Sequence, residues 1–310
     1  GVKINTEFRE YTRNLAKTDD VFIEDDIITP IFQLSKTGTN VLFIFLDRAL
    51  NAFFPSILEE MPALQEQMEG FVHYPNTVSF GQSTLFGAPA MVGGYEYTPD
   101  AMNRRTDELL VDKHNESLLV MPKLFLDAGY SVAITNPPFS NYKWEADYTP
   151  FYSYPDIKVM NQSMKFTLTY INEHQDELDW DPALESTLIQ KRLPVFSILK
   201  TSFPILRRIL YETGNYYQQT EGSTLLDLFL DRYSQLYYLS DLTDVVEEGD
   251  SFIMISNDTT HVPTILQTPE YEPRANVTNA STPLDGIDGV QAIDQSHYHS
   301  NAAALKRLGI

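Results

Sequence analysis

Several carboxylate and hydroxyl side chains occupy positions in this sequence that a parallel sheet would bring close together. The run NVLFIFLD ends in Asp47, and the run SFIMISND ends in Asn257 and Asp258. Ser83 and Thr84 lie in GQSTLFGAPAM, a stretch of small residues flanked by glycine. Carboxylate and hydroxyl oxygens can hold a divalent cation, and a cation beside a hydroxyl lowers the pKa of that hydroxyl. The chemistry that this pattern predicts is metal-assisted covalent catalysis.

The same residues have a simpler structural interpretation. Asp47 can cap the helix that follows it, and Ser83 or Thr84 can cap the next one. Short polar side chains are common at helix N-termini because they satisfy free backbone N–H groups there. On the residues alone, capping and catalysis both remain open.

The elements that carry these residues are predicted to form an α/β fold. Residues 40–47 and 251–258 are continuous apolar runs, which is typical of strands buried on both faces of a parallel sheet. Functional groups in such sheets gather at the carboxyl ends of the strands. Further strands are predicted over residues 71–80 and 131–136. Helices are predicted over residues 55–68, 117–130, 157–176, 184–211, 225–242 and 297–309, and a small-residue helix after Ser83, with a loop over 268–294.

Composition limits the classes of partner and of metal ligand. The net charge of −21 argues against nucleic acid, whose phosphates require clustered Lys and Arg. The 310 residues contain no cysteine, so any metal must be held by Asp, Glu, His, Thr or Ser. We interpret residues 1–38 as an N-terminal arm and residues 39–310 as one catalytic domain.

Four segments resemble a known family. GQSTLFGAPAM is similar to the nucleophile segment of lipid A phosphoethanolamine transferases, and NVLFIFLDRA resembles the strand that supplies their first acidic metal ligand. SLLVMPKLFLDAGYSVAITNPP resembles a helix and strand of lipoteichoic acid synthases, and NDTTHVPTILQTPEYEP resembles the segment that bears a substrate-site histidine. All four run in the family's order. The chain therefore resembles the sulfatase-like domain of the alkaline phosphatase superfamily.

This resemblance implies a fold, a reaction and a set of site residues. The fold is α/β, with a mixed, mostly parallel central sheet flanked by helices on both faces. Asp47 would be a metal ligand, Thr84 a ligand and the covalent nucleophile, and His261 a contact of the phosphoryl group or of a second ion, with Asn136 and Ser83 in the substrate site. The implied activity is a metal-dependent phosphotransferase or phosphodiester hydrolase that acts on cell-envelope lipid or polymer head groups. The cofactor would be a divalent ion, Mn, Mg, Zn or Ca.

The sequence also departs from the family. Family members complete the metal site with an Asp-His pair on a later strand, so we expect the chain to be C-terminally incomplete, without its last strands. Asn136 and Ala146 stand near the positions of a His and an Arg in lipoteichoic acid synthases, which predicts a different substrate. A sulfatase is an alternative, although Thr84 cannot yield formylglycine. A non-catalytic relative that binds an envelope component is a second alternative.

The expected location is the extracellular face of a bacterial membrane. No apolar stretch is long enough to cross a bilayer, so the expected membrane anchor would precede Gly1. Residues 186–211 carry five Lys and Arg and no acid. This segment can face anionic lipid at the membrane surface, or form a buried helical hairpin kinked at Pro194 and Pro204.

Overall fold

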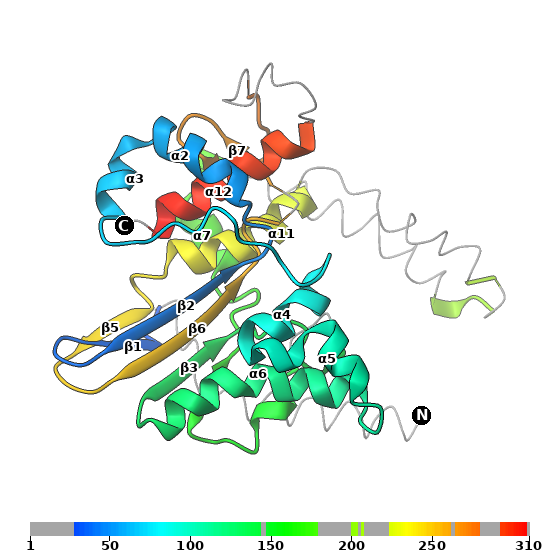
Figure 1. The fold of residues 1–310 in the computed structure, drawn as a ribbon. Coiled ribbons are helices and arrows are strands. Elements are labelled where there is room, and N and C mark those ends of the chain that lie inside the picture. The colour runs from blue at the N-terminus through cyan, green and yellow to red at the C-terminus, as the bar shows by residue number, and fades with distance from the viewer. Residues whose placement is uncertain are drawn as a thin grey trace.

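A four-stranded parallel sheet forms the centre of the protein in a computed structural model (Figure 1). The structure describes residues 28–143, 147–178, 200–203, 206–207, 223–261, 264–279 and 292–308. The strand order is β2 (Asn40–Leu46), β6 (Ser251–Asn257), β3 (Ser131–Thr135) and β4 (Ile157–Met160). All three neighbouring pairs are parallel. The predicted α/β class is confirmed, and β2, β3 and β6 lie where the apolar runs predicted them.

Successive side chains of a strand point to opposite faces of the sheet, so the apolar strands contribute to a hydrophobic core on each face. In β6, Phe252 and Met254 pack into one core, whereas Ile253 and Ile255 pack into the other. Every residue of β6 is buried. The first core is covered by α4 (Thr84–Gly93) and α6 (Leu110–Asp127). The second is covered by α7 (Thr167–Glu173), α11 (Ser223–Tyr237) and α12 (Ala292–Leu308) (Figure 1). Helices therefore flank the sheet on both faces.

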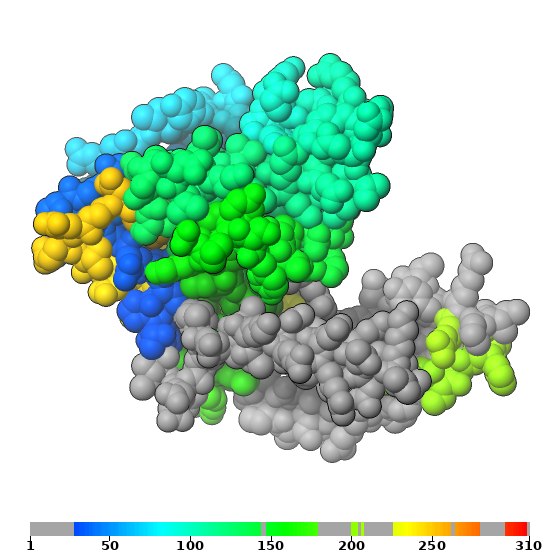
Figure 2. Space-filling model, turned by 90° about the horizontal axis from the view of Figure 1, so that it is seen from below, coloured from blue at the N-terminus to red at the C-terminus, as the bar shows by residue number. Residues whose placement is uncertain are grey.

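Two small sheets accompany the central one. β1 (Phe32–Ser35) pairs in parallel with β5 (Thr243–Val246), so the end of the predicted N-terminal arm takes part in the fold. Lys36, just after β1, contacts Glu247, just after β5. In Figure 2, blue and yellow parts of the chain lie side by side. β7 (Leu266–Gln267) and β8 (Glu272–Pro273) form an antiparallel pair; β8 lies within the segment 268–294 predicted as a loop, and β7 comes just before it.

The remaining helices are short. The predicted helix over 55–68 is broken into α2 (Phe54–Glu60) and α3 (Pro62–Gln67), because the residue before a proline avoids the helical conformation and Met61 has φ −121° and ψ 75°. The others are η2 (Asn51–Phe53), η3 (Tyr95–Tyr97), α5 (Pro99–Arg104), η4 (Ser140–Tyr142), η5 (Thr149–Phe151) and α8 (Gln175–Leu178).

Residues 71–80 are not a strand, and that prediction is wrong. The side-chain amide of Asn51 donates to the carbonyl oxygens of Tyr74 and Pro75, and Asn51 also contacts the ring of His73. Pro75 has no N–H to give to a ladder. These contacts fix the segment as an irregular stretch beside η2, with Phe71 and other apolar side chains exposed.

Two helix predictions also need correction. Residues 157–160 form β4, although a helix was predicted over 157–176; Ile157 and Met160 at its ends are buried, and the helices α7 and α8 come later. α6 begins at Leu110 rather than Ser117. Most of the basic segment 186–211 lies outside the described residues. Among the helices that the structure describes, none has the length and apolar character needed to span a bilayer.

Candidate functional site

Asp47 and Thr84 meet at the carboxyl end of the central sheet. Asp47 follows directly on β2, and Thr84 is the first residue of α4. The Thr84 hydroxyl donates a hydrogen bond of 2.9 Å to Oδ1 of Asp47. Both side chains are half-buried. The structure thus brings together the carboxylate and the hydroxyl that the sequence singled out.

The separation of these two oxygens suits a shared cation. Two oxygens bound at about 2.1 Å on neighbouring corners of an octahedral ion lie about 3 Å apart. Within the described ranges, no three His, Asp or Glu side chains are grouped to hold a metal ion. Asp47 and Thr84 therefore provide two adjacent oxygen donors, and hard divalent ions prefer oxygen.

A close approach at Gly81 shapes the start of α4. A Cβ atom at Gly81 would lie 2.5 Å from the Cβ of Phe86, so only glycine lets the loop fold back against the helix. Ser83 occupies the N-cap position, but its side chain makes no capping hydrogen bond. Its carbonyl oxygen accepts from the N–H groups of Phe86 and Gly87, both at 3.0 Å. The capping interpretation thus does not account for the Ser83 hydroxyl.

Asp258 adds a second carboxyl group to this edge of the sheet. Burial raises the pKa of Asp258, and the negative charges of Asp47 and Asp231 raise it further. The positive charges of Arg232 and His261 oppose that rise in pKa. Asp47, Arg232 and His261 are therefore close enough to Asp258 for their charges to act on it.

His261 lies in the turn that follows β6. Its backbone N–H donates to the carbonyl oxygen of Asp258 at 2.9 Å, and its side chain is half-buried. The structure places His261 on the same edge as Asp47, as the sequence predicted.

Asn136 also reaches this edge, but its amide is engaged with the protein. Its Nδ2 donates to Oε1 of Gln235 at 2.9 Å, and its Oδ1 accepts from the N–H of Gln162 at 3.2 Å. Its φ of +49° is in the left-handed region that non-glycine residues rarely adopt. Asn136 thus joins the end of β3 to α11 and to the segment after β4.

Arg232 was not recognised from the sequence. It belongs to α11, and its carbonyl oxygen accepts from Nδ2 of Asn257 at 2.9 Å, which holds this turn of the helix against the end of β6. The signal in the sequence is an Asp231-Arg232 pair between the apolar residues Leu230 and Tyr233. Both charged side chains are only half-buried, so this pair alone does not single out a site.

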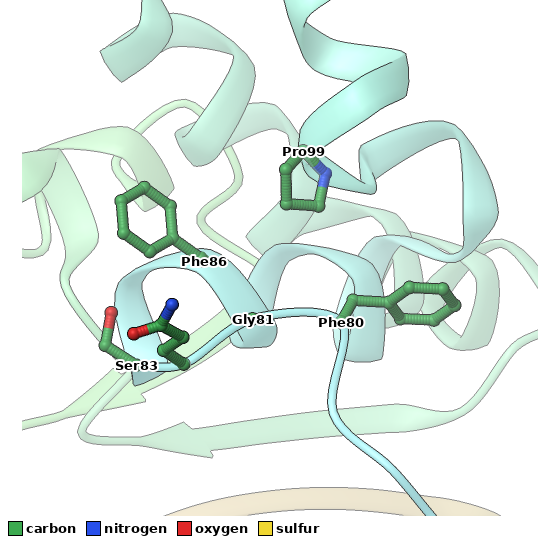
Figure 3. A pocket seen from close by; sticks show the side chains of 6 residues that line it. Phe80, Gly81, Ser83, Phe86 and Pro99 are labelled. Carbon is green, nitrogen blue, oxygen red and sulfur yellow. The ribbon is translucent and has the colours of Figure 1, made fainter.

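A pocket of about 550 Å³ lies against the loop before α4 and the start of that helix, with Ser83 in its lining (Figure 3). Phe80 and Gly81 come from the loop before α4, Ser83 and Phe86 from the start of that helix, and Pro99 from α5; Gln82 completes the lining. The rings of Phe80 and Phe86 remain 58% and 47% exposed, which is unusual for phenylalanine. The surface next to Ser83 is therefore largely apolar.

Comparison with known proteins finds no matching family model, no matching curated protein and no matching solved structure. The site is therefore interpreted from its own geometry.

Proposed function

We propose that the protein is a metal-dependent phosphotransferase or phosphodiester hydrolase in which Thr84 is the covalent nucleophile. The observation that carries this proposal is the 2.9 Å contact between the Thr84 hydroxyl and the Asp47 carboxylate at the end of a parallel sheet. A threonine hydroxyl is a weak nucleophile until a base or a cation activates it. Asp47 is placed to orient Thr84 and to share a divalent ion with it.

The reaction divides into two displacements on phosphorus. The Thr84 hydroxyl gives its proton to the Asp47 carboxylate that accepts its hydrogen bond, and the Thr84 oxygen forms a bond to the phosphorus of a phosphodiester. The bond from phosphorus to the leaving alcohol breaks, and that alcohol takes up the proton. A second hydroxyl, from an acceptor or from water, then forms a bond to phosphorus, and its proton passes to the released Thr84 oxygen. When bound by Asp47 and Thr84, a divalent ion supplies positive charge that lowers the pKa of the hydroxyl and stabilises phosphoryl oxygens.

Residues of this chain can also stabilise the transferred group. Thr84 begins a helix of ten residues, and backbone N–H groups at a helix N-terminus attract anions. Arg232 brings positive charge to the same edge of the sheet, where the imidazole of His261 also lies. The charge of phosphoryl oxygens would therefore be balanced on more than one side.

The resemblance to phosphoethanolamine transferases and lipoteichoic acid synthases supports this function. It supports a fold of the alkaline phosphatase and sulfatase type, and a domain held at the extracellular face of a bacterial membrane. The apolar lining of the pocket beside Ser83 supports a substrate with an apolar part, as an envelope lipid has. Among related activities, sulfate-ester hydrolysis is the less favoured, because the position of the modified Cys or Ser is held by Thr84.

A non-catalytic binding protein is the second candidate. It is favoured by the observation that the described residues hold no group of three carboxylate or histidine metal ligands. Such a protein would bind an anionic envelope component at the same edge and would form no bond to Thr84.

Trapping of a covalent intermediate separates the two candidates. The protein is incubated with Mn²⁺ and bis(p-nitrophenyl) phosphate, and its mass and peptide map are recorded. The proposal predicts release of p-nitrophenol and a phosphoryl adduct on Thr84 that is lost in Thr84→Val. The matched control is Ser83→Ala, which removes the neighbouring exposed hydroxyl and should keep the adduct. An unmodified Thr84 with no p-nitrophenol release would overturn the catalytic proposal.

A further inference from the structure

The turn that presents Asp47 is conformationally strained. The N–H of Ala49 donates to the carbonyl oxygen of Leu46 at 3.2 Å, which closes a tight turn around Asp47 and Arg48. Arg48 has a φ of +62°, a region that is unfavourable for side chains other than glycine. Strained turns persist only where surrounding contacts enforce them.

One enforcing contact comes from Thr260. Its hydroxyl donates to the backbone carbonyl oxygen of Asp47 at 2.5 Å. The backbone N–H of Asp47 donates to the backbone carbonyl oxygen of Asn257 at 3.0 Å. The Thr260 side chain is fully buried. On its other side, the Ser300 hydroxyl donates to the carbonyl oxygen of Thr260 at 3.3 Å. The peptide groups on both sides of the Asp47 Cα are thus held by hydrogen bonds.

A second enforcing contact comes from Asn301. Its Oδ1 accepts from the backbone N–H of Leu50 at 2.8 Å, just after the strained turn. Its Nδ2 donates to the carbonyl oxygen of His297 at 2.7 Å, one helical turn earlier. Because Nδ2 is used within the helix, Oδ1 is left facing Leu50, and the orientation of the amide is fixed.

The helix that carries Asn301 is itself firmly anchored. On α12, the Tyr298 hydroxyl donates to Glu60 at 2.5 Å, and Arg307 donates to Glu272 at 2.8 Å. Ser300 and Asn301 are buried. A rigid second layer of this kind is what precise placement of a ligating side chain requires.

We infer that Thr260 and Asn301 are positioning residues that hold the Asp47 carboxylate against Thr84 for cation binding. The inference rests on the proposed function. Neither residue touches the Thr84 hydroxyl; each acts on the backbone of the turn that carries Asp47. Loss of such outer contacts lowers metal affinity about 10-fold to 100-fold.

The test measures Mn²⁺ affinity by isothermal titration calorimetry. Thr260→Val removes the hydroxyl that donates to Asp47 and should weaken Mn²⁺ binding at least about tenfold. Thr259→Val is the matched control, because Thr259 is equally buried and its hydroxyl meets no hydrogen-bond partner among the described residues. Thr260→Ser keeps the donor and should restore affinity, and Asn301→Leu should weaken it as Thr260→Val does.

The outcomes separate the inference from the function on which it rests. If the wild-type protein binds Mn²⁺ and both Thr260→Val and Asn301→Leu bind it with unchanged affinity, the positioning role is overturned and the proposed function stands. If the wild-type protein binds no Mn²⁺, the proposed cation site fails and the inference fails with it. Melting temperatures of Thr259→Val and Thr260→Val show whether either change unfolds the protein, and Thr260→Ser tests the role without removing the hydroxyl.

Discussion

The side-chain amide of Asn257 donates to the carbonyl oxygen of Arg232 at 2.9 Å, which fastens the carboxyl end of β6 to the middle of α11. The same side chain accepts from the N–H of Thr259 at 2.8 Å through Oδ1. Asn257 is buried, and its bond to the Thr259 N–H is made away from water. Asn257 thus joins β6 to α11 and to the turn through Asp258 and Thr259.

Asn257→Ala is expected to destabilise the protein by about 2 kcal/mol, because it leaves the buried N–H of Thr259 without its acceptor and removes the hydrogen bond that ties β6 to α11. Urea unfolding followed by circular dichroism measures this change. A midpoint equal to that of the wild-type protein would show that the contact between β6 and α11 is not needed for stability.

Gly81→Ala is expected to displace the loop before α4, because the new Cβ would lie 2.5 Å from the Cβ of Phe86. We predict a loss of about 1 to 3 kcal/mol in unfolding free energy, typical of overpacking, and a lower rate of adduct formation at Thr84. The control is Gly87→Ala, whose Cβ would meet only the Ser79 hydroxyl. That side chain can rotate away, although it then loses the 3.2 Å hydrogen bond that it accepts from the Gly81 N–H, so Gly87→Ala should lower both quantities less than Gly81→Ala does. Equal effects from the two variants would contradict the role assigned to Gly81.

His114 is expected to make stability depend on pH. It is fully buried on α6, with Nε2 at 3.1 Å from the carbonyl oxygen of Pro138. Burial lowers the pKa of His114 below its ordinary value of 6.5, against the opposing effect of that hydrogen bond. The unfolded chain therefore takes up the proton first, so the unfolding free energy is highest above pH 6.5 and falls as the pH drops toward the lowered pKa.

His114→Gln removes this titration. The variant should be less stable than the wild-type protein by about 1 to 2 kcal/mol near pH 7.5, with a smaller difference near pH 5. Urea denaturation at a series of pH values measures the unfolding free energy of the variant and of the wild-type protein. A difference between the two proteins that stays constant over this range would rule out His114 as the source.

Phe86→Ala is expected to reduce the use of substrates that carry an apolar chain. For dodecyl p-nitrophenyl phosphate, loss of the ring from the pocket should lower kcat/KM about tenfold, which corresponds to about 1.4 kcal/mol of lost apolar contact. For methyl p-nitrophenyl phosphate, kcat/KM should stay unchanged. Phe203→Ala, which removes an exposed ring outside the pocket, is the control. Equal losses for both substrates would remove the pocket from substrate recognition.

The parts of the fold that the sequence predicts are those in which one physical signal dominates. Continuous apolar runs predicted both β2 and β6, but only β6 is buried along its whole length, as a strand covered on both faces is. β2 lies at the edge of the sheet, and its residues are half-buried or exposed. Residues 71–80 were predicted as a strand from a broken apolar alternation, but contacts from Asn51 and the missing N–H of Pro75 determine their structure. Such contacts between separate segments cannot be inferred from local pattern alone.

In the candidate site, too, some features could be predicted from the sequence and others could not. Asp47 and Thr84 were predicted to lie together, and they do. Their supports, Thr260 and Asn301, act through hydrogen bonds to backbone atoms, and no sequence motif records such bonds. Arg232 was missed because its role follows from the packing of α11 against the end of β6.

The central claim is that Asp47 and Thr84 share one cation, and a double-mutant cycle on Mn²⁺ affinity tests it most directly. Asp47→Asn and Thr84→Val are measured singly and together by calorimetry. If the two residues bind the same ion, each single variant loses most of the affinity, and the double variant loses much less than the sum of the two losses. Wild-type affinity in both single variants, or two losses that simply add, would contradict the account.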